Sequence, residues 1–183
     1  MTTPKIARRS VLAGLGAALI ARPALPTPGE ARELRLYNVN TGESFRDAYF
    51  NGEGYVASAL PRLNWFLRDH REAAAAEVDP HLFDILWNVQ LNYLRFHGAH
   101  VVLNVHSAYR TERTNAMLRN EGAAQNSYHK LGRAIDISAQ GYGIYFLYDM
   151  VQNCGAGGTG VYMRSQFAHV DTGPRRSWIQ PLW

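Results

Sequence analysis

The sequence is poor in cysteine. Cys154 is the one cysteine among 183 residues, so an internal disulfide is excluded. Three of the four residues after it are glycines, and this spacing is not that of a metal-binding cysteine cluster. We therefore expect Cys154 to be a buried small residue rather than a catalytic thiol. The chain also lacks internal repeats and low-complexity tracts, and its length fits one domain plus an appendage.

Acidic residues are absent from the N-terminal segment, because Glu30 is the first Asp or Glu in the chain. The whole chain has 19 Lys and Arg against 15 Asp and Glu, which gives a formal charge of +4. Four of the basic residues precede Glu30 and account for the entire excess. The rest of the chain is neutral, so neither a nucleic acid nor an acidic membrane surface is expected as its main partner.

The N-terminal apolar run, Val11–Ala21, is too short to cross a bilayer comfortably. It follows the pair Arg8–Arg9, and the whole segment resembles a twin-arginine export signal. A general secretory signal that happens to contain two arginines is the alternative. We expect residues 1–31 to be an export signal and linker that directs the protein to the periplasm. No clean A-x-A cleavage site follows the run, so both cleavage within 21–33 and retention as a membrane anchor stay open.

The rest of the chain alternates between helical and strand-like patterns. Asp79 and Pro80 begin the clearest helix and Gly98 ends it, whereas Thr41-Gly42 indicates a hairpin. The expected helices cover 58–70, 79–98, 112–119 and 141–153, and the other expected strands cover 101–106, 134–138, 157–163 and 167–172. This order predicts an α+β fold in which a small antiparallel sheet carries the functional site and packs against several helices. The domain is expected to cover residues 32–183.

The stretch "SYHKLGRAIDIS" combines a histidine, a glycine and an aspartate just before a strand. Alternation within "AIDIS" places Ile135 and Ile137 on one face and Asp136 on the other. The isoleucines suit the core, so Asp136 is expected to point away from it. Gly132 allows a sharp turn, which can bring His129 next to Asp136.

The later stretch "FAHVD" supplies more polar groups. His169 and Asp171 share one face of this strand, about 7 Å apart along it. Two histidines and one carboxylate suit a catalytic zinc site, which leaves a fourth position for water. On this division His129, Asp136 and His169 bind the metal, and Asp171 either takes a proton from the water or orients a ligand. Spacing alone does not decide between this site and chance pairs of histidines.

The motif S-x-H-x-x-G-x-A-x-D resembles the signature of the D-Ala-D-Ala metallopeptidase superfamily, which also contains lysostaphin-type enzymes and the hedgehog signalling domain. "HVD" resembles the strand that supplies the third ligand in this superfamily, and "SAYRT" is similar to the segment before the signature. Stretches from "LYNVNTGE" to "HVDTGPRRSW" resemble one subgroup, the exported murein endopeptidases, over residues 34–183. The motif residues are Ser127, His129, Gly132, Ala134 and Asp136.

The resemblance implies one Zn²⁺ per chain, held by His129, Asp136 and His169. It also implies that Arg110 holds or polarises the substrate carbonyl, where a fixed guanidinium stabilises developing oxyanion charge. The alternative for Arg110 is a salt bridge to a surface acid.

The sequence departs from the family pattern at Gln166. Several relatives have a glutamate as the catalytic base at this position, three residues before the last histidine, and glutamine cannot replace it. The base role therefore passes to Asp171. Ser127 and Tyr109 are predicted at the substrate side, with Ser127 bonding within the signature loop rather than acting as a nucleophile. The aromatic residues that either line the cleft or pack as core are Tyr109, Tyr128, Tyr162 and Trp178.

These expectations combine into a zinc-dependent endopeptidase that hydrolyses peptide cross-links of bacterial peptidoglycan with metal-activated water. One rival is a carboxypeptidase that removes terminal D-alanine, which would need a cationic pocket; the candidates are Arg113, Arg175 and Arg176. Another rival is a non-catalytic zinc-containing module that binds peptidoglycan. This alternative stays open because Gln166 stands where several relatives have the catalytic glutamate. No residue indicates which type of cross-link is cut.

Overall fold

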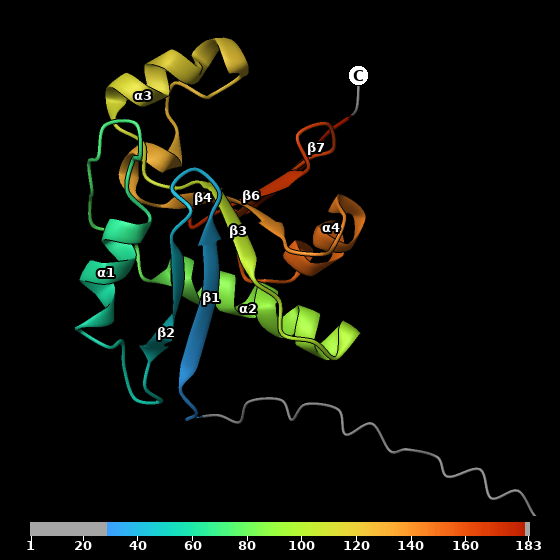
Figure 1. The fold of residues 1–183 in the computed structure, drawn as a ribbon. Coiled ribbons are helices and arrows are strands. Elements are labelled where there is room, and N and C mark those ends of the chain that lie inside the picture. Colours follow the sequence, from blue (N-terminus) through green and yellow to red (C-terminus); the bar gives the residue numbers. More distant parts are fainter. Residues whose placement is uncertain (1–28, 182–183) are drawn as a thin grey trace, which may run out of the picture.

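The computed structural model describes residues 29–181, so all but the last three positions of the predicted signal and linker lie outside the described residues. Figure 1 shows the fold. In chain order the elements are β1 (Arg32–Asn38), β2 (Ser44–Phe50), α1 (Ala59–Phe66), α2 (His81–His97), β3 (Leu103–Ser107), α3 (Glu112–Met117), the 3-10 helices η1 (Leu118–Glu121) and η2 (Tyr128–Leu131), β4 (Ala134–Ala139), α4 (Ile144–Gln152), β5 (Gly158–Tyr162), β6 (Phe167–Asp171) and β7 (Arg176–Gln180). Within this part of the chain, no helix is long and apolar enough to cross a membrane.

The strands form one seven-stranded sheet in the order β2-β1-β3-β4-β6-β5-β7. Neighbouring strands are antiparallel except for β1 with β3 and β5 with β7, which are parallel. The α+β prediction is confirmed, but the prediction of a small antiparallel sheet is wrong in both size and pairing. Part of the reason is the long connection through α1 and α2, which returns the chain beside β1 in the same direction.

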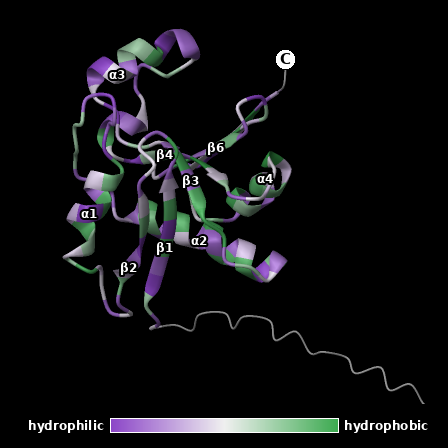
Figure 2. Cartoon of the chain, viewed as in Figure 1, coloured by the Kyte–Doolittle hydropathy of each residue, from purple (hydrophilic) through white to green (hydrophobic). Residues whose placement is uncertain are grey.

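The two faces of the sheet differ in chemistry. One face carries fully buried hydrophobic residues such as Ile135, Ile137 and Val170, and it packs against α1, α2 and α4. In Figure 1, α2 passes behind β1, and Figure 2 shows hydrophobic residues mainly on β3, α4 and the part of α2 behind the sheet. The opposite face carries polar side chains of β4 and β6, including Asp136 and His169. The hydrophobic face anchors the sheet, and the polar face carries the site.

The start and the end of α2 lie close to the positions that the sequence predicts. The side chain of Asp79 accepts a hydrogen bond from the backbone N–H of His81 at 3.1 Å, at the predicted start of the helix. Gly98 ends the helix in the left-handed conformation, with φ of 66°. The helix predicted within 141–153 is confirmed as α4. The cysteine that follows it, Cys154, is fully buried, as predicted.

The helix predicted over 58–70 is shorter than expected. α1 ends at Phe66, because the chain then turns back on itself and the backbones of Asp69 and Ala74 pair. Ser58 precedes the helix, but its side chain accepts no capping hydrogen bond. The resulting turn, residues 69–74, lies next to the segment that follows β3, since the backbone N–H of Thr111 donates to the Asp69 carboxylate at 2.9 Å.

Candidate metal centre

Asp136 and His169 lie opposite each other on neighbouring strands of the polar face. β4 and β6 pair antiparallel, with Asp136 in register with His169. Directly opposed residues of such a pair have Cβ atoms about 5 Å apart, so their side chains meet. The alternation that buries Ile135 and Ile137 in the core thereby directs both polar side chains to the same side of the sheet.

A separate segment, η2, brings His129 to the same point. The hydroxyl of Ser127 caps this turn by accepting a hydrogen bond from the N–H of His129 at 3.3 Å. Gly132 ends the turn with φ of 64°, and a Cβ there would overlap the backbone carbonyl of Glu77. The backbone N–H of Arg110 also donates to the carbonyl of His129 at 3.2 Å. These contacts hold His129 in a buried position, 2% exposed.

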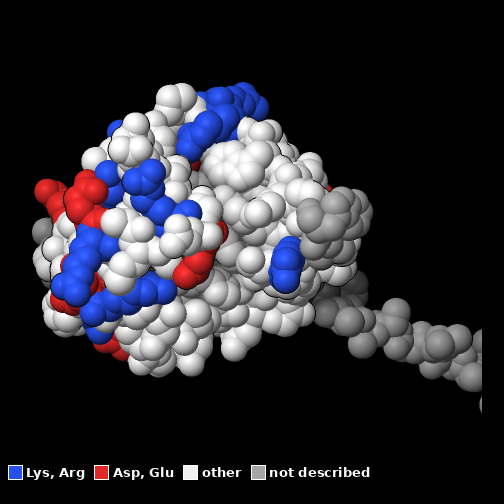
Figure 3. Space-filling view, turned by 90° about the horizontal axis from the view of Figure 1, so that it is seen from above, with Lys and Arg blue, Asp and Glu red and all other residues white. Residues whose placement is uncertain are grey.

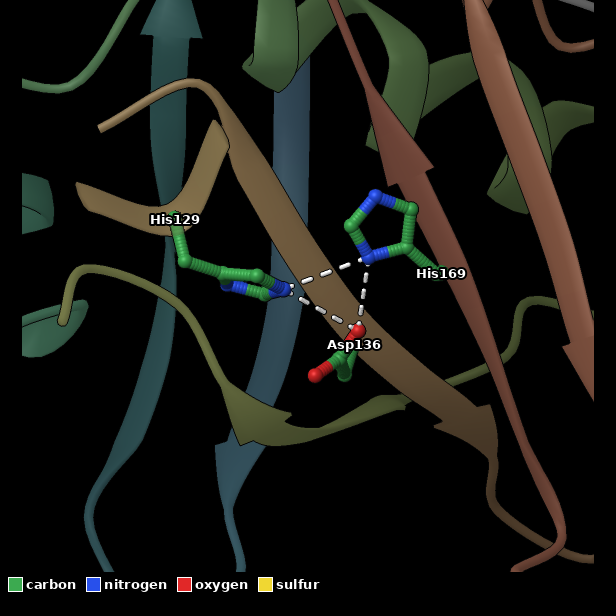
Figure 4. Close-up of side chains that lie close together, drawn as sticks. All are labelled: His129, Asp136 and His169. Carbon is green, nitrogen blue, oxygen red and sulfur yellow. Dashed lines mark hydrogen bonds and ion pairs between the residues drawn. The ribbon is translucent and has the colours of Figure 1, made fainter. Parts of the chain in front are cut away.

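The three side chains converge on one point (Figure 4). Asp136 Oδ1 lies 2.9 Å from His169 Nδ1 and 3.3 Å from His129 Nε2, and the two nitrogens are 3.2 Å apart. Ligands at the usual zinc distances of about 2.0–2.1 Å would lie about 3.3 Å from one another in a tetrahedral arrangement. The three atoms are therefore spaced as one small metal ion requires, and they form a possible metal-binding group within the described residues.

Hydrogen bonds fix the orientation of both imidazole rings. His129 Nδ1 lies 2.7 Å from the backbone carbonyl of Ala108, and because a carbonyl only accepts, this nitrogen donates. His169 Nε2 lies 2.8 Å from Asp171 Oδ2. The other nitrogen of each ring faces Asp136. This is the orientation in which protein imidazoles ligate metals, with the far N–H held by a carbonyl or a carboxylate.

The charges of the cluster favour a cation. Burial alone would raise the pKa of Asp136, but His129 and His169 outweigh burial and hold this pKa well below its ordinary value. Burial lowers the pKa of His129 despite the neighbouring carboxylate. Burial would also lower the pKa of His169, but its hydrogen bonds to Asp136 and Asp171 raise it to about 9. The cluster therefore favours positive charge beside Asp136, which is the charge that a bound metal ion would supply.

A cavity of about 760 Å³ opens over the cluster. Its lining includes all three residues of the cluster together with Arg110 and Ser127, which were predicted at the site. Three of the aromatic residues left open by the sequence also line it: Tyr128, Tyr162 and Trp178. The site is thus accessible to a substrate from one side and supported by the sheet from the other.

Tyr109 and Gln166 lie outside this cavity lining. Tyr109 is not among the described residues that line this cavity, and its backbone N–H instead bonds to the carbonyl of Leu67 at 3.0 Å. Gln166 lies in the exposed turn between β5 and β6, with φ of 57°, and its side chain bonds to the backbone of Met163. This position, where the family resemblance implies a glutamate in several relatives, is not among the described residues that line the cavity.

Asp171 is surrounded by protein groups and has no exposed surface. Besides contacting His169, it accepts hydrogen bonds from the backbone N–H groups of Gly158 at 3.1 Å and Gly173 at 2.8 Å. The guanidinium of Arg176 donates to it at 2.6 Å. Asp171 bonds to the ring nitrogen of His169 that faces away from Asp136. Of the two roles open from the sequence, these contacts match the orientation of a ligand better than proton transfer.

Arg110 contacts the cluster directly. Its guanidinium donates to Asp136 Oδ2 at 2.5 Å and to the hydroxyl of Ser107 at 2.7 Å. Asp136 therefore presents one oxygen to the histidines and the other to Arg110. The salt bridge foreseen as the alternative for Arg110 exists, but its partner is a buried residue of the cluster rather than a surface acid.

His106 and Arg71 are among the residues of the cavity lining that were not predicted from the sequence. His106 Nε2 lies 2.8 Å from the hydroxyl of Ser138, one alternation along β4 from Asp136. The alternation within "LNVHS" places His106 opposite the apolar residues of this strand, so this signal was present in the sequence. Arg71 lies in the 69–74 turn, where no periodicity relates it to the site.

Comparisons with known proteins identify the family of the chain. A sequence model of the family described as peptidoglycan L,D-endopeptidase MepK matches residues 27–178. The chain is 38% identical over 179 residues to peptidoglycan L,D-endopeptidase MepK of Escherichia coli K12, covering 93% of this chain and 96% of that protein. It is 36% identical over 162 residues to the probable peptidoglycan L,D-endopeptidase MepK of Haemophilus influenzae, covering 87% and 84%. The chain therefore belongs to the peptidoglycan L,D-endopeptidase MepK family of peptidases.

Proposed function

We propose that this protein is a zinc-dependent endopeptidase that hydrolyses peptide cross-links of bacterial peptidoglycan. The observation that carries the proposal is the convergence of His129 Nε2, Asp136 Oδ1 and His169 Nδ1 under an open cavity. Two nitrogens and one carboxylate oxygen form a donor set that zinc accepts, with one position left for reacting groups. The names of the family and its members, which specify peptidoglycan, support this substrate.

Bound zinc supplies the Lewis acidity that activates water and polarises an amide carbonyl. The chain's own residues supply the orientation. Asp171 and Ala108 hold the far N–H groups of the two imidazoles, and Arg110 holds the second oxygen of Asp136. We assign Asp171 to the positioning of His169, because its oxygens are already engaged by four groups within the protein.

Arg110 has a second role in this proposal. It lines the cavity while its guanidinium is fixed by Ser107 and Asp136. A fixed cation beside the reacting carbonyl stabilises the negative charge that develops on the oxygen in the transition state. Arg110 thus both aligns a ligand and contributes to the binding of the reacting group.

The names of the relatives specify an L,D bond, and stereochemistry indicates which cross-link contains one. An L,D bond has its carbonyl on an L centre and its nitrogen on a D centre. A cross-link in which D-alanine donates the carbonyl would instead be a D,D bond. We therefore propose that the substrate is the cross-link between two diamino acids, in which the L centre of one acylates the D-centre amine of the other.

The test uses purified protein and purified sacculi, with soluble products identified by mass. We expect zinc-dependent release of uncrosslinked muropeptides and loss of this release with a chelator. His129→Ala should abolish both zinc binding and release, whereas His81→Ala, at an exposed histidine, should do neither. Loss of terminal D-alanine alone would indicate a carboxypeptidase, and binding to sacculi without any product would indicate a binding module.

We also propose that residues 1–31 direct export to the periplasm through the twin-arginine route, as the pair Arg8–Arg9 suggests. Replacement of both arginines by lysine in the full chain should leave the protein in the cytoplasm, as measured by fractionation. Unchanged export of this variant would point to the general secretory route.

A further inference from the structure

Three arginines line the cavity above the cluster, and two of them are engaged by acidic residues. Arg110 donates to Asp136, and Arg176 donates to Asp171. The third is Arg71, and within residues 29–181 its guanidinium has no hydrogen bond or ion pair. Arg71 is therefore the cation of the lining that is available to an anionic group of the substrate.

The backbone at Arg71 is held firmly although its side chain is exposed. Its N–H donates to Asp69 Oδ1 at 3.0 Å, and the N–H of Thr111 donates to the other oxygen at 2.9 Å. Asp69 itself is 2% exposed, and its backbone pairs with Ala74 to close the turn. One buried carboxylate thus ties the backbone of Arg71 to the residue that follows Arg110. The backbone segments that carry Arg71 and Arg110 are thereby held next to each other.

The surrounding charges make this arginine distinct. In the view from above, Lys and Arg side chains gather mainly on one half of the face, many beside Asp or Glu, while the other half is largely uncharged (Figure 3). Arg113 is an example of a paired cation, because it lies 3.4 Å from Glu72. It lines a neighbouring hollow that Arg71 also borders, but unlike Arg71 it is not part of the lining of the site cavity. A carboxylate entering the cavity would therefore find its free partner in Arg71.

We propose that Arg71 binds the free carboxylate on the carbon that bears the scissile nitrogen, and so selects substrates with this charge. The inference rests on the proposed function, in which the leaving amine belongs to the D centre of a diamino acid. That centre carries a carboxylate, and a guanidinium binds a carboxylate through two parallel hydrogen bonds. A terminal D-alanine places a carboxylate on the same carbon, so both kinds of substrate offer the group that Arg71 would recognise.

The test compares two cross-linked peptide dimers that differ in one group. In one dimer the D-centre carboxylate is free, and in the other it is a carboxamide. We expect Arg71→Ala to lower kcat/KM for the free dimer by about 10- to 100-fold and to leave the amidated dimer nearly unchanged. Arg71→Lys should keep part of the preference, and the control Arg113→Ala should keep all of it.

The outcomes separate this inference from the proposed function. If the wild type cleaves neither dimer, both fail. If it cleaves both dimers equally, or if Arg71→Ala slows both to the same extent, the selective role of Arg71 is wrong while the endopeptidase stands. A linear tetrapeptide that ends in D-alanine is the third substrate. Faster cleavage of this peptide than of the dimer, with the same dependence on Arg71, would assign the carboxylate to a chain end and overturn the assignment to a cross-link.

Discussion

Asp171 accepts hydrogen bonds from two backbone N–H groups, a guanidinium and the ring of His169, all without contact with solvent. We propose that these neighbours make Asp171 a poor acceptor of a proton. Burial by itself would raise the pKa of Asp171, but His169, Arg176 and the N–H of Gly173 lower it far below the ordinary range. A carboxylate with so low a pKa holds a ligand well and takes up a proton poorly.

Replacement of Asp171 by asparagine distinguishes its two possible roles. We expect Asp171→Asn to weaken zinc binding by about 10- to 100-fold, because the N–H of His169 loses a charged acceptor. Zinc affinity is measured by competition with a chromophoric chelator. Asp149→Asn, at an exposed position of α4, is the control. Unchanged zinc affinity together with lost turnover would instead make Asp171 the general base.

At the scale of elements, η2 depends on a glycine. Gly132 has φ of 64°, and a side chain there would also overlap the Glu77 carbonyl. Gly141 has φ of 81° but has open space around the position of a Cβ. Because both alanine variants carry the backbone strain and only one carries the overlap, their difference reports the close approach of η2 to the segment before α2.

We expect Gly132→Ala to lower the free energy of unfolding by about 2–4 kcal/mol and Gly141→Ala by about 1 kcal/mol. Denaturant unfolding measures both values. Zinc binding should also weaken in Gly132→Ala, since this turn places His129. Equal effects of the two substitutions would show that the contact with Glu77 is unimportant.

The contribution of Asp69 to the stability of the 69–74 turn is expected to depend on pH. Burial would raise the pKa of Asp69, but the neighbouring Thr114 side chain and the hydrogen bonds from the backbone N–H groups of Thr111 and Arg71 outweigh burial and lower this pKa. A carboxylate with a lowered pKa stabilises the fold above its ordinary pKa, and this stabilisation is lost as the pH falls. Asp69→Asn should therefore cost about 1–2 kcal/mol near pH 7 and progressively less below about pH 4.

Denaturant midpoints of the wild type and of Asp69→Asn across this pH range measure the effect. Asp47→Asn, at an exposed carboxylate of β2, is the control and should show a small difference at each pH. A cost that does not change with pH would mean that packing, and not charge, accounts for the contribution of Asp69.

For the whole molecule, metal binding is expected to stabilise the fold. The cluster joins β4, β6 and η2, so an ion that binds the folded state shifts the unfolding equilibrium. At 100 times its Kd, zinc should add about 2.7 kcal/mol, which corresponds to a rise in Tm on the order of 5–10 °C. Differential scanning calorimetry with zinc and with a chelator measures this rise. His129→Ala should show no rise, and an equal rise in that variant would place the metal elsewhere.

Features that depend on local periodicity could be predicted from the sequence. The alternation in "AIDIS" separates Asp136 from the isoleucines, and the helical spacing before Gly98 defines α2. These patterns are local because each side chain's direction follows from the backbone of its own strand or helix. The three cluster residues could also be predicted from the sequence as one metal site, but only through resemblance to a family. Their spacing alone did not exclude that the histidines are paired by chance.

Which distant groups meet could be learned only from the three-dimensional fold. The register of β4 with β6 places Asp136 opposite His169, and the turn at Gly132 brings His129 to them. Arg176 engages Asp171, and Arg71 faces the cavity from a turn with no periodic pattern. Strand order, register and loop positions result from how the whole chain buries its apolar surface and pairs its backbone groups, and no short stretch of sequence contains that information.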